Sequence, residues 1–239
     1  MAVLQQGQYR VLVLDTPDMP RPDWRDAIRW RLKDVVDFAV DDAGIDLLDM
    51  AADSPKRRHA VLLAVAAPRV ALTLLTDAAA DAGLQWQAID VPETALRNLC
   101  LLAAGALRCE ALLHVGSTFS TLVITAGSEL LATRNIDSGL DRLRDPDAAA
   151  RRQHYERAGL ELQRTLDNIG RQFRQANLAR LQVAPGLPLQ GFIDYLRAVV
   201  SVPVVAFDLG AVLDLSAVPE LIDPAEQAAY LPAIGAALR

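Results

Sequence analysis

An α/β fold is the class that the sequence predicts, on three observations. Short β-branched and aliphatic runs alternate with longer stretches whose apolar residues recur at helical spacing. Of the 239 residues, 52% are hydrophobic and 23% are charged, which suits a buried core and excludes a disordered chain. No apolar run approaches the roughly 18–20 residues that a membrane span needs. We therefore expect a mixed sheet covered by helices.

Charge and cysteine content narrow the class of protein. The formal net charge is −6, which argues against nonspecific attraction to nucleic acid or anionic lipid. Cys100 and Cys109 form no CxxC motif, so we expect two buried free thiols rather than a disulfide scaffold. The first residues lack the charged and apolar regions of a signal peptide. We expect a cytoplasmic protein that inserts into no membrane and binds no nucleic acid.

The first predicted elements are a strand, a turn and a helix. Tyr9–Leu14 has the composition of a strand, and Asp15–Pro22 that of a proline-rich turn. A helix is expected from Asp23, and Trp30 lies off its apolar stripe. The apolar stripe of this helix comprises Trp24, Ile28, Leu32, Val35 and Val36.

Strands and helices continue to alternate up to residue 104. Strands are expected at Ile45–Met50, His59–Ala67 and Leu84–Val91. Helices are expected at Pro68–Ala82, with Pro68 in the first helical position, and at Pro92–Ala104. This alternation favours a mixed sheet with helical cover.

A second unit begins near Glu110 with a strand, a hairpin and a long helix. Ala111–Val115 is the strand, and Ser120–Thr125 with Glu129–Ile136 is the hairpin. Asp147–Ala176 is the longest helix, about 45 Å at 1.5 Å per residue. The remaining expected elements are a strand at Leu178–Val183, a helix at Leu189–Val200, a strand at Val204–Phe207 and a C-terminal helix at Ala228–Arg239.

The common catalytic and metal-binding motifs are missing from the sequence. It contains no P-loop, no GxGxxG after a strand, no HExxH and no GxSxG. The three histidines, His59, His114 and His154, fall on different predicted elements, so we expect no metal site. The motifs therefore identify no catalytic residue.

One stretch, from His114 to Gly139, combines glycines and hydroxyl side chains in a pattern that can bind a ligand. A strand ends at Gly116, hydroxyl side chains follow, and a hairpin leads to a second glycine-containing turn. Glycine permits a close backbone approach, and hydroxyl and main-chain N–H groups can hold phosphate. An ordinary β-meander with Ser and Thr at its turns is the alternative, and spacing alone favours it.

The order of the elements favours the phosphate-binding hairpin over the ordinary β-meander. The stretch resembles the second phosphate-binding hairpin of the actin-like ATPase superfamily. The resemblance extends to one branch, the PilM family of type IV pilus assembly proteins, and within it most closely to MshI proteins of mannose-sensitive haemagglutinin (MSHA) pilus biogenesis. The segments that carry it are Asp15–Pro22, Arg29–Asp46, Ala82–Asn98, the hairpin 114–139, Arg180–Gly191 and Ala233–Arg239.

The resemblance implies an actin-like, ribonuclease H-like fold with two lobes. Residues 1–109 would form an incomplete first lobe with an inserted PilM-type subdomain. Residues 110–239 would form the second lobe and a helix that returns to the first. PilM-like proteins are scaffolds on the cytoplasmic face of the inner membrane. They bind a cytoplasmic peptide of a PilN-like, membrane-anchored partner and couple it to the assembly motor.

The resemblance also implies a degenerate nucleotide site. His114 stands where catalytic members carry an acid, and a neutral imidazole cannot hold Mg²⁺ through water. Pro185 and Gly186 replace a Gly-Gly pair, and the first phosphate hairpin would precede Tyr9. We expect no ATP hydrolysis and leave Mg-ATP binding open; an active ATPase or kinase is the alternative. The candidate residues are Gly116, Ser117, Thr118, Ser120, Gly139, Pro185, Gly186 and Gly235.

A partner-binding surface is expected on the first predicted helix. Trp30, which lies between Arg29 and Arg31, could anchor a partner, and Phe38 follows the helix. The alternative, equally favoured, is that Trp30 packs against another part of the same chain.

Overall fold

The computed structural model describes residues 1–50, 61–104, 109–173 and 177–239, which divide into two compact units, Met1–Val91 and Pro92–Arg239. The lobe boundary expected between residues 109 and 110 stays a prediction. The start of the strand expected from His59 and the end of the helix expected to reach Ala176 lie outside the described residues.

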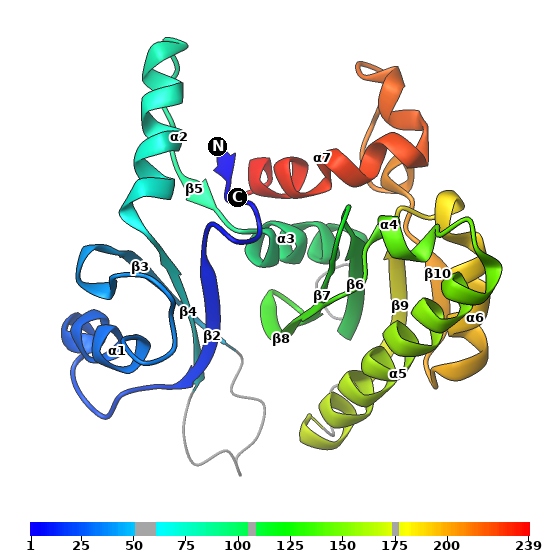
Figure 1. Cartoon of the computed structure of the whole chain (residues 1–239), viewed down its shortest axis with the longest axis horizontal. Coiled ribbons are helices and arrows are strands. Elements are labelled where there is room, and N and C mark those ends of the chain that lie inside the picture. The colour runs from blue at the N-terminus through cyan, green and yellow to red at the C-terminus, as the bar shows by residue number, and fades with distance from the viewer. Residues whose placement is uncertain (51–60, 105–108, 174–176) are drawn as a thin grey trace. The chain divides into compact units, whose positions relative to one another are not determined.

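The first unit contains a three-stranded antiparallel sheet (Figure 1). Strand β4 (Val61–Ala67) lies between β2 (Arg10–Asp15) and β3 (Gly44–Asp49). Because side chains alternate along a strand, Leu62, Ala64 and Ala66 share one face of β4, where they join one hydrophobic cluster.

Helix α1 (Trp24–Leu32), which follows a short 3-10 turn at Arg21–Asp23, packs on that face through Ile28 and Leu32. The helix ends at Leu32, earlier than the apolar stripe predicted. Val35 therefore lies past its end and is 56% exposed, so its assignment to the buried stripe was wrong. Val40 closes the cluster from a second 3-10 turn, Val40–Asp42.

A second cluster contains residues of helix α2 (Arg69–Asp81) and of β4. Pro68 precedes the helix in an extended conformation, so its expected place inside the first turn was wrong by one residue. The strand expected at Leu84–Val91 reduces to β5 (Ile89–Asp90), which pairs in parallel with β1 (Ala2–Val3). The reason is that the Trp86 indole donates to the Leu75 carbonyl, which holds the segment against α2.

The second unit contains a five-stranded sheet in the order β10-β9-β6-β7-β8. Strands β6 to β8 form an antiparallel meander, and β9 and β10 run parallel to β6. This is the ribonuclease H-like topology expected for the second lobe. The bounds are β6 Cys109–Val115, β7 Ser120–Ala126, β8 Glu129–Ile136, β9 Leu178–Ala184 and β10 Val204–Ala206.

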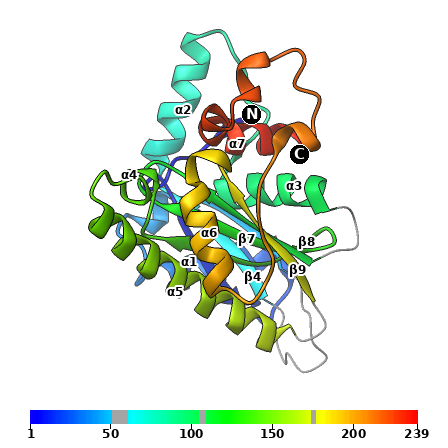
Figure 2. The same cartoon turned by 90° about the vertical axis from the view of Figure 1, so that its right-hand side faces the viewer.

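Helices cover both faces of this sheet (Figure 2). The side chain of Asn135 reaches Glu93 of α3 (Pro92–Ala104) at 3.4 Å. The neighbouring Arg134 reaches Glu161 of α5 (Ala148–Gln172) at 3.5 Å, so the two helices lie on opposite faces. The aromatic rings of Tyr155 in α5 and Phe192 in α6 (Gln190–Val199) lie 5.1 Å apart.

The C-terminal helix α7 (Pro224–Ala237) packs closely on α3. A Cβ atom at Gly235 would overlap the carbonyl group of Ala95, and the Asn98 amide donates to the Gly235 carbonyl at 2.9 Å. The helix begins earlier than the expected Ala228. The short elements between the larger ones are α4 (Leu140–Leu143) and 3-10 turns at Leu187–Leu189, Leu209–Ala211 and Pro219–Ile222.

Both cysteines are free and buried, which confirms the prediction made from their number and spacing. Burial raises the pKa of the Cys100 thiol to about 12. Within the described ranges, none of the helices combines the length and the apolar character needed to cross a membrane.

Candidate functional site

Most of the predicted nucleotide-site residues gather at one edge of the five-stranded sheet. Strands β6, β9 and β10 run parallel, so their carboxyl ends share this edge. Gly116, Ser117 and Thr118 follow β6, and Pro185 with Gly186 follows β9. Ser120, at the start of β7, and Gly139, after β8, lie at the same edge because Ser120 pairs with Ile136.

The turn at residues 116–119 is closed by backbone hydrogen bonds. The Gly116 amide donates to the Phe119 carbonyl at 3.0 Å. The carbonyls of Gly116 and Ser117 accept from the amides of Leu140 and Asp141 at 2.8 and 3.0 Å. A Cβ atom at Gly139 would overlap the backbone of Ser117, so only glycine permits this close approach.

A buried hydroxyl adds a further bond between the two segments. The Ser120 hydroxyl donates to the Ser138 carbonyl at 2.5 Å. Ser120 and Ser138 are both buried, whereas Ser117 and Thr118 are exposed at the tip of the turn. The exposed pair are therefore the hydroxyls of this edge that a ligand from solvent can reach.

His114 lies one residue before the end of β6 and is buried beneath α7. Its Nε2 lies 2.7 Å from the Ala228 carbonyl of that helix, and because a carbonyl only accepts, Nε2 carries the proton. Burial lowers the pKa of this imidazole. His114 is thus a neutral imidazole that already has a hydrogen-bond partner within the chain.

The other candidate positions differ in their surroundings. The Ala184–Pro185 peptide bond is cis, and a Cβ atom at Gly186 would lie 2.7 Å from the Cβ of Ala206. Gly235 does not join the turn but lies where α7 crosses α3. Among the residues that the structure describes, no group of three His, Cys, Asp or Glu side chains is placed to hold a metal ion.

Trp30, one of the predicted partner-binding residues, has an exposed side chain. It is 75% exposed, and the Lys33 ammonium lies 5.3 Å from the centre of its ring. A cation over an indole face is attracted by the ring, which holds the side chain against the surface. Such an exposed indole is unlike the packed alternative considered from sequence.

The remaining three predicted partner-binding residues bond or pack within the first unit. Arg29 donates to the carbonyls of Val40 and Ala43, and Arg31 donates to the Asp15 carbonyl at 2.7 Å. Phe38 is half-buried and packs against the cluster beneath α1. These residues support the surface on which Trp30 stands.

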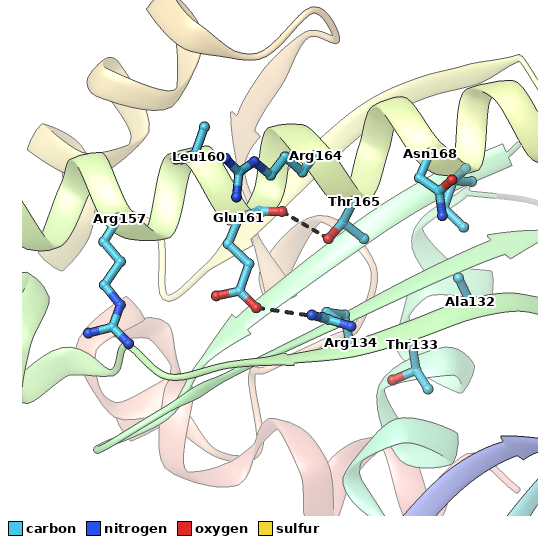
Figure 3. Close-up of a pocket in the computed structure, with 10 residues that line it drawn as sticks. Ala132, Thr133, Arg134, Arg157, Leu160, Glu161, Arg164, Thr165 and Asn168 are labelled. Carbon is cyan, nitrogen blue, oxygen red and sulfur yellow. Dashed lines mark hydrogen bonds and ion pairs between the residues drawn. The ribbon is translucent and has the colours of Figure 1, made fainter.

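A groove that the sequence did not predict lies in the second unit, between β8 and α5 (Figure 3). It encloses about 640 Å³, and Arg157 and Glu161 extend from α5 toward the strand. Arg157 and Arg164 are spaced to lie on one side of a helix, which indicated a basic helix face. Nothing in the sequence placed β8 beside that face. The groove is lined by Ala132, Thr133, Arg134, Arg157, Leu160, Glu161, Arg164, Thr165, Asn168 and Ile169.

Comparison with known proteins gives structural but no sequence relatives. No family model and no curated protein sequence matches the chain. A chain of a PilM-PilN type IV pilus biogenesis complex matches with a TM-score of 0.66 and 21% identity, over 99% of this chain and 77% of that one.

Two further solved structures are more distant. An actin-like ATPase-fold protein of unknown function from Bacteroides thetaiotaomicron matches with a TM-score of 0.47 and 8% identity, over 86% of this chain and 67% of that one. The cytoplasmic domain of EpsL, an inner-membrane component of the type II secretion system of Vibrio cholerae, matches with a TM-score of 0.44 and 10% identity. The match covers 76% of this chain and 59% of that one.

The similarity to the PilM-PilN chain shows the fold. Together with the strand order of the second unit, it establishes that this chain has the α/β, actin-like fold that the sequence predicted. The fold by itself assigns no activity.

Proposed function

We propose that the chain is a non-catalytic scaffold of a type IV pilus, MSHA-like or related secretion assembly platform. It would bind the cytoplasmic peptide of a PilN-like inner-membrane partner, be held at the membrane through that partner, and contact other platform or motor components. The observation that carries the proposal is the fold shared over 99% of the chain with a chain of the PilM-PilN complex.

The carboxyl edge supports a scaffold rather than an ATPase. Mg²⁺ takes oxygen ligands, and the side chain at the family's acid position is a buried, neutral imidazole bonded to α7. A neutral imidazole at this position favours a scaffold over a magnesium-dependent ATPase. The exposed hydroxyls of Ser117 and Thr118 leave room for weak phosphate contact without metal.

Trp30 is the proposed anchor for the partner peptide. Large exposed aromatic side chains dominate binding energy at interfaces, and loss of one costs about 2 kcal/mol or more. Trp30→Ala should weaken binding of the partner's synthetic N-terminal peptide at least about thirtyfold, measured by calorimetry. The melting temperature should change little, because the indole is mostly exposed.

Trp86→Phe provides the matched control, since that indole is part-buried against α2 and bonded to Leu75. It should lower the melting temperature and leave peptide binding unchanged. A Trp30→Ala variant that loses stability but binds normally would contradict the proposed anchor.

A calorimetric titration with Mg-ATP separates the scaffold from an active ATPase or kinase. The scaffold should show no steady hydrolysis and no sub-millimolar affinity. Steady hydrolysis or a sub-millimolar affinity for Mg-ATP in the intact chain would contradict the proposal, whatever the outcome with Trp30.

A further inference from the structure

Strand β8 is an edge strand with an open outer side. Its neighbour in the sheet is β7, and no described strand pairs with its other side. Along an antiparallel edge strand, alternate residues direct their N–H and C=O groups away from the neighbour. Residues 134 and 135, near the carboxyl end of β8, are exposed. The strand therefore offers a template to which an extended chain can add.

Helix α5 forms the opposite wall and supplies positive charge. Arg157, Glu161, Arg164 and Asn168 recur every three or four residues, so they share one side of the helix. The distance from Arg157 to Asn168 along the axis is about 16 Å, the length of roughly five extended residues. The groove thus matches a short extended peptide in length.

The charges of the groove are only partly neutralised within the chain. Arg134 pairs with Glu161 at 3.5 Å, and Arg157 lies 3.7 Å from Asp137. Arg164 is exposed and forms no ion pair with any described residue. In a chain whose net charge is −6, a groove with three arginines and one glutamate is a local reversal of sign.

We propose that this groove binds an acidic extended segment of a partner protein by strand addition to β8. Main-chain hydrogen bonds to the open edge would set the register of the segment. Its carboxylates would pair with Arg157 and Arg164, whose guanidinium groups suit such acceptors. This surface lies in the second unit and extends beyond the proposed function, whose Trp30 anchor is in the first.

The test uses the whole chain and three fluorescein-labelled peptides, each about nine residues long with blocked ends. The first alternates Val and Asp, the second alternates Val and Lys, and the third is the Val-Asp peptide with two central Val residues replaced by Pro. Fluorescence anisotropy measures the dissociation constants. The Val-Asp peptide should bind at least about tenfold tighter than either other peptide, and its binding should weaken with added salt.

Two variants locate the binding on α5. Arg164→Glu should weaken binding of the Val-Asp peptide at least about tenfold, because it replaces attraction with repulsion. Arg152→Glu makes the same charge change on the same helix outside the groove and should leave the affinity within about twofold. Hydrogen exchange should show new protection at residues 132–135 of β8 on binding.

Several outcomes would overturn the proposal. These are no binding of the Val-Asp peptide at millimolar concentration, equal binding of the Pro-containing peptide, and equal loss in the two arginine variants. Sedimentation of the chain alone tests whether a second copy occupies the groove. A dimer that dissociates in the Arg164→Glu variant would show that a second copy fills it. Because none of these readouts involves Trp30, their failure is distinguishable from failure of the proposed function.

Discussion

Two regions of the second unit differ in whether their polar groups find partners within the chain. At the carboxyl edge, the 116–119 turn bonds to residues 140 and 141, and His114 bonds to α7. In the groove between β8 and α5, the strand edge is unpaired and Arg164 lacks an ion pair among the described residues. The carboxyl edge, where the predicted nucleotide-site residues gather, is held by hydrogen bonds within the chain, whereas the groove is open.

This difference predicts that the carboxyl edge contributes to the stability of the chain and that the groove contributes to its binding. Removing one partner of a buried hydrogen bond lowers the free energy of unfolding, because the polar group that remains is buried without a bond. An exposed charge in an open groove contributes little to that free energy. Substitutions at the edge should therefore destabilise the chain, and substitutions in the groove should change only its binding.

The largest effect is expected from Gly139→Val. Any Cβ atom there would overlap the Ser117 backbone, which cannot move away without breaking the bonds of the turn. The free energy of unfolding should fall by about 3 kcal/mol or more in urea titrations. Gly170→Ala on α5 is the matched control, since nothing lies near its Cβ position, and it should raise stability by about 0.5–1 kcal/mol. A Gly139→Val variant as stable as wild type would show that the edge is not closed.

A smaller effect, with a defined pH dependence, is expected from His114. Burial lowers the pKa of the folded imidazole, so below about pH 6.5 the unfolded chain takes up a proton that the folded chain does not. This contribution to stability is present above that pH and is lost as the pH falls through it, by at most about 1.4 kcal/mol per pH unit.

His114→Gln should remove this dependence and keep a side-chain amide that can donate to Ala228. The loss of stability between pH 7.5 and 5.5, measured in urea, should be smaller in the variant, by no more than about 1.4 kcal/mol per pH unit. An equal loss in both proteins would mean that His114 is protonated in the fold, and that the edge is more open than its contacts indicate.

The smallest effect on folding is expected in the groove. Arg164→Glu should change the free energy of unfolding by no more than about 0.5 kcal/mol, because the arginine is exposed and forms no ion pair with the described residues. Urea titrations followed by circular dichroism measure this free energy. A loss of several kcal/mol would place Arg164 among the side chains that hold α5 in place.

Local sequence signals predicted most of the elements. Helix α3 and strand β8 have the expected bounds, because Pro92 and the glycine turn at Gly127 mark their starts. Two expectations failed where tertiary contacts decided. Helix α1 ends at Leu32 before its stripe does, and the segment before β5 is held against α2 by Trp86.

The candidate residues at the carboxyl edge were grouped in advance only through the resemblance to actin-like proteins, and the structure brings most of them together because parallel strands end at one edge. Their surroundings could not be predicted. The contact of Gly235 with α3 and the bond from His114 to Ala228 join residues far apart in the chain. Whether these candidates bind nucleotide stays a prediction.

The sequence by itself determined the α/β class, the order of elements, the buried thiols and the exposed indole's place off the helical stripe, because each depends on local periodicity and composition. The tertiary structure alone decided which side chains meet. It brought Arg134 of β8 beside Glu161 of α5, and it buried His114 beneath α7. Local patterns fix which way a side chain faces along its own element, whereas its partners depend on how distant elements pack.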